Sequence, residues 1–193
     1  MQISGYLILA ILFLSCSDPG NGKRSARLNE LSSGKSANKD NVSKHVNFGQ
    51  SAIQINTGTT TPQETVAFAN SLIGIPYKYG STNPDEGFDC SGFITYVFNH
   101  FKINVPRSSV DFTSVNHPIA LNAAKTGDLI LFTGTDSTVK VVGHMGILVV
   151  QPGQSVSFIH STSGKAYGVT ETPLNAYYMG RYMKTVRVFT QNN

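Results

Sequence analysis

The chain has 193 residues, of which 40% are hydrophobic and 13% are charged, and its formal net charge is +4. This length suits one domain with appendages and excludes a TIM barrel or two full-sized domains, while the hydrophobic content excludes a wholly disordered chain. The low charge content argues against coiled coils, and two cysteines are too few for a disulfide framework or a four-cysteine zinc site.

The first fifteen residues carry the pattern of an export signal. An apolar run of nine residues, Tyr6 to Leu14, is too short to span a bilayer but has the length of a signal-peptide core. With Ser15-Cys16 after it, the segment resembles a bacterial lipoprotein signal, although no basic residue precedes the run and Phe13-Leu14 replace the usual pair. The alternatives are a plain secretory signal and an N-terminal core strand. We expect residues 1–15 to be removed, and lipid on Cys16 to anchor an exported chain to a membrane of the cell envelope.

Most of the net charge lies in the next segment, residues 16–61. This segment holds six basic and three acidic side chains, whereas residues 62–193 hold nine basic and eight acidic ones. Its content of Ser, Asn, Gly and Lys predicts a flexible linker, and its basic run favours a solvated segment over a site for anionic lipid or wall polymer. Since no nucleic-acid-binding motif accompanies it, we expect no nucleic-acid partner.

Residues 62–193 are expected to form one α+β domain. Thr61-Pro62-Gln63-Glu64 has the form of a capping box and predicts a helix that ends at Gly74. A second helix is expected from Asp89 or Cys90, and a short one from Ser108. The period then changes, and strands are expected at residues 128–133, 141–151, 156–162, 166–172 and 182–190. Helices followed by an antiparallel meander are typical of an α+β fold in which N-terminal helices pack on a central sheet.

Cys90 is a candidate nucleophile because it stands where a loop passes into the second expected helix. A helix N-terminus lowers the pKa of a thiol, and its free N–H groups can bind an oxyanion. A buried structural cysteine, or a disulfide to Cys16, is the competing interpretation. Asp89 and Ser91 beside it, and Gly87 and Gly92 around it, favour a reactive thiol.

Two histidines on successive strands are candidates for a base and its orienting partner. Alternation places His144 on the same face as Gly146 and Leu148, and His160 lies on the next strand. A turn through residues 151–153 sets His144 directly opposite His160, and a turn shifted by one residue keeps both on the same face. Cys90, His144 and His160 could also hold a metal, but no fourth ligand is evident, and we expect no metal and no cofactor. His45, His100 and His117 receive no role.

Five stretches in order resemble the NlpC/P60 family of cell-wall cysteine peptidases. They are Gly74-Ile75-Pro76-Tyr77-Lys78-Tyr79-Gly80, Phe88-Asp89-Cys90-Ser91-Gly92-Phe93, Val105-Pro106-Arg107-Ser108-Ser109, Thr126-Gly127-Asp128-Leu129-Ile130, and Gly143-His144-Met145-Gly146-Ile147 followed by Phe158-Ile159-His160. The resemblance covers about residues 62–190. It departs from the family pattern near the expected groove, where Ser81 replaces a glycine and Phe112 stands where a glutamine is frequent.

The resemblance implies a papain-like fold and hydrolysis of peptidoglycan stem peptides by a Cys90-His144-His160 triad. It further implies that Asp89 and Ser91 contact the stem peptide, that the Tyr77 hydroxyl lies near the oxyanion, and that Arg107 organises a loop. We expect a monomer that cuts the γ-D-glutamyl–diamino acid bond. The alternatives are the D-alanyl–diamino acid cross-link, an amidase or acyltransferase reaction, and a non-catalytic wall-binding lipoprotein.

Overall fold

The computed structural model describes residues 52–115 and 117–190, and a six-stranded antiparallel sheet forms their centre. The strands of this sheet are β3 (Pro118–Ile119), β4 (Leu129–Thr133), β5 (Val142–Val149), β6 (Ser157–Thr162), β7 (Gly168–Pro173) and β8 (Tyr182–Val186). Their order is β3-β8-β4-β5-β6-β7, and every neighbouring pair is antiparallel. The sheet therefore contains the expected meander from β4 to β7, with β8 returning beside β4.

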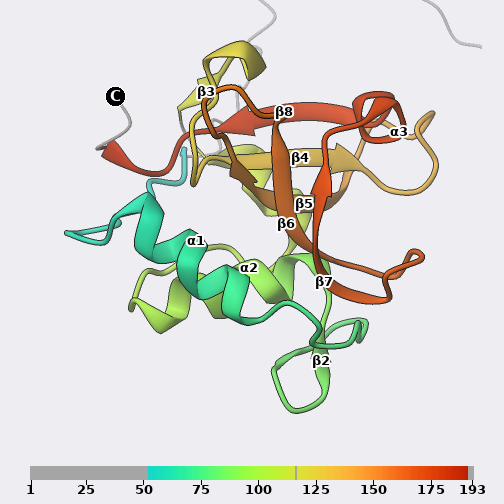
Figure 1. Ribbon diagram of the computed structural model, residues 1–193, viewed down its shortest axis with the longest axis horizontal. Coiled ribbons are helices and arrows are strands. Elements are labelled where there is room, and N and C mark those ends of the chain that lie inside the picture. The colour runs from blue at the N-terminus through green and yellow to red at the C-terminus, as the bar shows by residue number, and fades with distance from the viewer. Residues whose placement is uncertain (1–51, 116, 191–193) are drawn as a thin grey trace, which may run out of the picture. The chain divides into compact units, whose positions relative to one another are not determined.

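Two helices, α1 (Pro62–Ser71) and α2 (Cys90–His100), lie together on one side of this sheet (Figure 1). The capping box predicted for α1 is confirmed, since the Thr61 hydroxyl accepts from the Glu64 N–H and the Glu64 carboxylate accepts from the Thr61 N–H. The helix ends at Ser71, three residues before the glycine at which we expected it to stop. The predicted α+β class, with N-terminal helices packed on an antiparallel sheet, is confirmed.

The main core lies between α2 and the sheet. Phe93 and Val97 of α2 and Met145 of β5 are wholly buried in it, and each such side chain contributes about 1.5–3 kcal/mol of transfer free energy. A second, smaller core covers the other face of the sheet, where Phe132 and Phe158 contact Tyr178 of the short helix α3 (Ala176–Met179). Alternation places His144 and His160 on this second face.

Several short elements were not expected from the sequence. The loop at residues 80–88 contains a hairpin of β1 (Thr82–Asn83) and β2 (Gly87–Phe88), and strand β3, helix α3 and the 3-10 turn η2 (Leu121–Ala123) are also additions. The helix expected from Ser108 is the 3-10 helix η1 (Ser109–Ser114). Each of these pieces is too short to show a hydrophobic period.

The folded domain begins before the boundary expected at Pro62. The Ile53 N–H donates to the Ser114 carbonyl at 2.8 Å, Ile55 packs against the main core, and Thr57 is buried. The end of the expected linker is therefore part of the domain, because Ile53 and Ile55 pack against apolar residues of the main core. The expected signal at residues 1–15, the lipidation site Cys16 and the linker up to residue 51 lie outside the described residues.

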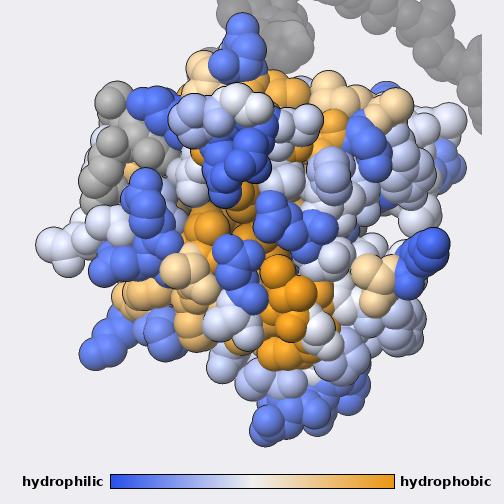
Figure 2. Space-filling view, in the orientation of Figure 1, coloured by the Kyte–Doolittle hydropathy of each residue, from blue (hydrophilic) through white to orange (hydrophobic). Residues whose placement is uncertain are grey.

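The face of the molecule shown in Figure 2 has hydrophobic residues gathered near its middle and hydrophilic ones around them. Among residues 52–115 and 117–190, no helix has the length and apolar character needed to cross a membrane.

Candidate active site

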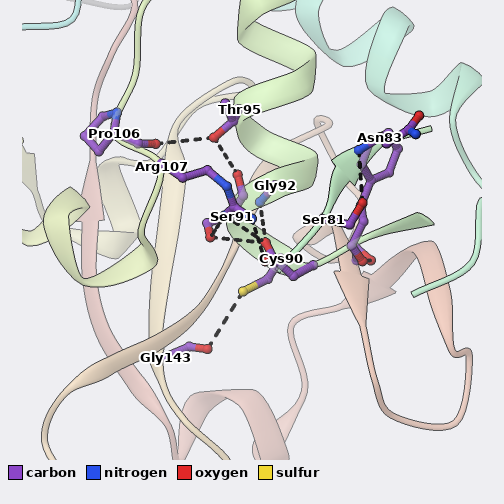
Figure 3. A network of polar contacts seen from close by, with 12 residues as sticks. Ser81, Asn83, Cys90, Ser91, Gly92, Thr95, Pro106, Arg107 and Gly143 are labelled. Carbon is purple, nitrogen blue, oxygen red and sulfur yellow. Dashed lines mark hydrogen bonds and ion pairs between the residues drawn. The ribbon is translucent and has the colours of Figure 1, made fainter. Parts of the chain in front are cut away.

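Cys90 is the first residue of α2, and contacts of Asp89 and Gly92 fix the backbone on either side of it. Asp89 caps the helix in an extended conformation, and its Oδ1 accepts from the Gly92 N–H at 2.5 Å. Gly92 is required here because a Cβ at this position would lie 2.0 Å from the Ser81 carbonyl oxygen. The thiol is free, and its Sγ points toward the Gly143 carbonyl oxygen, 3.8 Å away, at the start of β5 (Figure 3).

Arg107 joins the helix cap to the segment after α2. Its Nη2 lies 2.8 Å from Oδ2 of Asp89, and its Nη1 donates to Oδ1 of Asp89 at 3.2 Å and to Oγ of Ser91 at 3.0 Å (Figure 3). Such a two-pronged ion pair is geometrically specific. It holds Asp89 and Ser91 in fixed positions, and both are more than nine-tenths buried. Their predicted contact with the stem peptide stays a prediction, and neither lines the cleft described below.

The histidine pair is brought together by the register of β5 and β6. Ile147 lies opposite Ile159, and the same register sets His160 opposite Gly146. The direct opposition of His144 and His160 is therefore wrong, and the shifted turn that we also considered is the observed one. A Cβ at residue 146 would lie 3.2 Å from that of His160, so the glycine leaves room for the imidazole. Nε2 of His144 lies 2.8 Å from Nδ1 of His160.

The hydroxyl group of Thr172 extends the hydrogen bonds of the histidine pair. Nε2 of His160 lies 2.9 Å from Oγ1 of Thr172 on β7, and the imidazole of His160 is wholly buried. The bond to His160 uses Nε2 of His144, so Nδ1 is the ring nitrogen that lies outside this pair. If Nδ1 is to accept a proton, Nε2 of His144 must donate to His160, and Nε2 of His160 must donate to Thr172. The hydroxyl of Thr172 can accept this proton, so its position is compatible with the tautomer in which Nδ1 of His144 carries no proton. Sequence reasoning missed this threonine because nothing local distinguishes it from its neighbours.

Burial keeps the thiol and both imidazoles neutral in the free protein. It raises the pKa of the Cys90 thiol to about 11, and the negative charge of Asp89 acts in the same direction. The N–H groups of Cys90, Ser91 and Met145 favour the thiolate, but they do not outweigh desolvation. The low thiol pKa expected from the helix N-terminus is therefore wrong. Burial likewise lowers the pKa of His160 to about 3 and that of His144 well below its usual value, with the charge of Arg181 adding to both effects.

Cys90 and His144 open into the same cleft, which has a volume of about 880 Å³. Tyr77 lines this cleft, and burial raises the pKa of its phenol, with nearby Cys90 and Asp89 contributing. The phenol is therefore a hydrogen-bond donor at neutral pH. Phe112, which we placed near the groove, is instead wholly buried in the main core.

Sequence reasoning also missed Arg181, a cleft residue whose cation is largely buried. Its Nε and Nη2 donate to the carbonyls of Gly134 and Thr133, each at 2.9 Å, and its Nη1 donates to the Tyr177 hydroxyl at 2.8 Å. The guanidinium also lies over the rings of Tyr177 and Tyr178. Arg181 thus fixes one wall of the cleft by joining β4 to α3.

The described part of the chain contains no group of three or more His, Cys, Asp or Glu side chains arranged to hold a metal ion. His100 instead stacks on Phe68, and the backbone carbonyl of His117 accepts from the Arg187 N–H.

A helix that begins with a cysteine, facing an antiparallel sheet that carries two bonded histidines, defines a papain-like α+β fold. A sequence model of the NlpC/P60 family matches residues 74–188, which is more than half of the chain. The chain therefore belongs to the NlpC/P60 family.

Three bacterial proteins are similar in sequence to this part of the chain. The gamma-DL-glutamyl hydrolase of Bacillus subtilis (strain 168) is 35% identical over 135 residues, which cover 70% of this chain and 32% of that protein. The bifunctional muramidase/DL-endopeptidase CwlT of the same strain is 33% identical and covers 66% of this chain and 38% of its own length. The murein DD-endopeptidase MepH of Escherichia coli (strain K12) is 30% identical, over 61% of this chain and 42% of that protein. The chain spans less than half the length of each.

Solved structures agree on the fold. An NlpC/P60 family protein from Bacillus cereus ATCC 10987 superposes with a TM-score of 0.60 at 26% identity, over 69% of this chain and 42% of that one. The NlpC/p60 domain of the peptidoglycan hydrolase SagA superposes with a TM-score of 0.54, also at 26% identity, over 66% of this chain and 99% of that one.

Proposed function

We propose that this protein is a cysteine peptidase that hydrolyses the stem peptides of peptidoglycan. The observation that carries the proposal is the shared cleft, in which a free thiol at a helix N-terminus accompanies His144, whose other ring nitrogen is bonded to His160 at 2.8 Å. A nucleophile, a base and an orienting group are what acyl transfer requires. A non-catalytic wall-binding protein would have no need of this arrangement.

In the proposed reaction, Sγ of Cys90 attacks the amide carbonyl carbon while its proton passes to Nδ1 of His144. The thiol is neutral before substrate binds and loses its proton as it reacts. The pair of Cys90 thiolate and His144 imidazolium therefore forms only when substrate is present. The Cys90 N–H and the Tyr77 hydroxyl are the groups that we propose to stabilise the oxyanion. His144 then gives its proton to the leaving amine as the C–N bond breaks and a thioester forms. Water, deprotonated by His144, cleaves the thioester, releases a carboxylic acid and restores the thiol.

The first choice of bond is the γ-D-glutamyl–diamino acid bond, which the name of the Bacillus subtilis gamma-DL-glutamyl hydrolase supports. The D-alanyl–diamino acid cross-link is the second candidate, because the Escherichia coli relative is a murein DD-endopeptidase. We propose that Asp89 and Ser91, at the N-terminal end of α2, contact the stem peptide. We further propose a monomer, exported and held at the cell envelope by lipid on Cys16.

Digestion of purified peptidoglycan and defined muropeptides by the wild type and by Cys90→Ala tests the reaction. Fragment masses distinguish the two bonds, because γ-cleavage leaves dipeptides on the glycan whereas cross-link cleavage turns dimers into monomers. We expect products with the wild type only. Cleavage that persists in Cys90→Ala would refute the nucleophile, and binding without cleavage would support a wall-binding protein. Incorporation of a labelled fatty acid in the wild type and not in Cys16→Ser tests the anchor.

A further inference from the structure

The cleft beside Cys90 has an uneven distribution of charge. Of the described residues that line it, two carry a charge, Lys165 and Arg181, and both are cations. No Asp or Glu side chain is among these lining residues. A cleft with cations and without carboxylates attracts anionic groups, and its low-dielectric walls strengthen that attraction.

The two cations are not equally free to bind a ligand. Each of the three guanidinium nitrogens of Arg181 donates to a protein oxygen, and the residue is 7% exposed. Lys165 is exposed, and its amine forms no ion pair with any residue that the structure describes. Arg181 therefore builds the wall, whereas the charge of Lys165 is uncompensated at the rim.

Lys165 stands on the loop between β6 and β7, and this loop is held at several points. The Gly164 N–H donates to Oγ1 of Thr162 at 3.0 Å, and the Tyr167 N–H donates to the Gly164 carbonyl at 2.9 Å. The Tyr167 carbonyl accepts from the Tyr77 N–H at 3.0 Å, which ties the loop to another residue that lines the cleft. Tyr167 also has a φ of 46°, a conformation that a bulky residue adopts only when its surroundings impose it.

We infer that Lys165 binds a carboxylate of the peptide substrate beside the scissile bond. This inference rests on the proposed function and specifies the substrate that the site selects. A γ-linked glutamyl residue keeps its α-carboxylate free, a few bonds from the amide that is cut, and the diamino acid on the other side carries a carboxylate of its own. The amine of Lys165 is a compact, mobile point charge that can meet either group.

Substrates that differ in one charge test this inference. The substrates are stem peptides with free carboxyls, with the glutamyl α-carboxyl amidated, and with the diamino acid carboxyl amidated. We expect Lys165→Gln to lower kcat/KM about three- to tenfold on the free acid, mainly through KM, and Lys165→Arg to restore most of it. Amidation of the carboxyl that Lys165 binds should abolish the difference between wild type and Lys165→Gln, which identifies that group.

Lys102→Gln is the matched control. This exposed lysine follows the C-terminal end of α2, about 16 Å along the helix from Cys90. The substitution therefore removes the same charge as Lys165→Gln, but far from the cleft. We expect it to leave kcat/KM unchanged. Equal losses from Lys165→Gln on all three substrates, or equal losses from both lysine variants, would overturn the inference.

Binding to the Cys90→Ala protein separates recognition from cleavage. Titration calorimetry with the same three peptides should show a three- to tenfold weaker affinity when Lys165→Gln is added, except for the peptide in which the carboxyl that Lys165 binds is amidated. If the wild type cuts no stem peptide but this difference in binding persists, the proposed reaction fails and the carboxylate site stands. If the difference is absent, the carboxylate site is wrong, whatever the wild type cleaves.

Discussion

Nε2 of His160 lies 2.9 Å from Oγ1 of Thr172, so the second histidine of the pair has a hydroxyl group as its other hydrogen-bond partner. Because His160 is wholly buried, its ring N–H needs this acceptor. When Thr172 accepts from Nε2 of His160, Nδ1 of His160 is left to accept from Nε2 of His144. In the proposed reaction, this arrangement leaves Nδ1 of His144 able to accept the proton of the thiol.

Thr172→Val should therefore lower kcat about 10- to 100-fold while KM changes less than about threefold. An unsatisfied buried N–H costs about 1–3 kcal/mol, which favours the tautomer that leaves His144 with its proton toward the thiol. Steady-state kinetics on muropeptides measure this, and Thr172→Ser should keep most of the activity. Thr170→Val, the same change two residues earlier on β7, is the control. An unchanged kcat in Thr172→Val would show that the hydroxyl does not select the tautomer.

The thiol should be slow to alkylate at neutral pH. Because the pKa of Cys90 is raised to about 11, the thiolate fraction at pH 7 is about 10⁻⁴, and it grows about tenfold for each unit of pH below the pKa. The rate of iodoacetamide labelling, followed by mass spectrometry of the peptide that contains Cys90, should rise through pH 10 without levelling off. A free cysteine, measured in parallel, should level off near pH 9. A plateau for Cys90 below pH 8 would instead indicate a stable thiolate–imidazolium pair.

Arg107→Met should lower the free energy of unfolding by about 1–3 kcal/mol, because it leaves the buried carboxylate of Asp89 without its cation. This loss is smaller than for a fully buried pair, since the Arg107 side chain is 42% exposed. Urea denaturation measures the difference. Lys78→Met is the matched control, because it removes a pair whose side chains are 51% and 50% exposed, and it should cost less than about 1 kcal/mol. Equal losses in the two variants would argue against a structural role for the Asp89–Arg107 pair.

Gly146→Ala should impair both stability and activity. The added Cβ would lie 2.6 Å from Cδ2 of Phe158 and 2.8 Å from the Ile159 carbonyl oxygen, so β6 and His160 must shift. We expect a loss of about 1–3 kcal/mol in unfolding free energy and at least a tenfold lower kcat. Gly180→Ala, whose Cβ would meet only ordinary contacts at 3.5 Å and beyond, should change neither. Thermal unfolding and kinetics on the same samples check both effects, and native values for Gly146→Ala would contradict the close approach.

The elements that the sequence predicted well are those with local signals. The capping box before α1, the aspartate before Cys90 and the alternation along β5 and β6 depend on residues a few positions apart. The hairpin β1–β2 and helix α3 lack such signals, because they are too short to have a period and form by packing on neighbours. The same reason explains why Ile53 and Ile55 were placed in the linker.

The class of fold and the candidate residues Cys90, His144 and His160 could be predicted from the sequence, because each depends on residue type and short spacing. The folded structure was needed for the register that places His160 opposite Gly146 and for the partners Arg107 and Thr172, because these depend on contacts between distant segments of the chain. It also decided the state of the thiol. The sequence indicates the helix N-terminus that favours a thiolate, whereas burial, which reverses the outcome, is the sum of contacts from the whole domain.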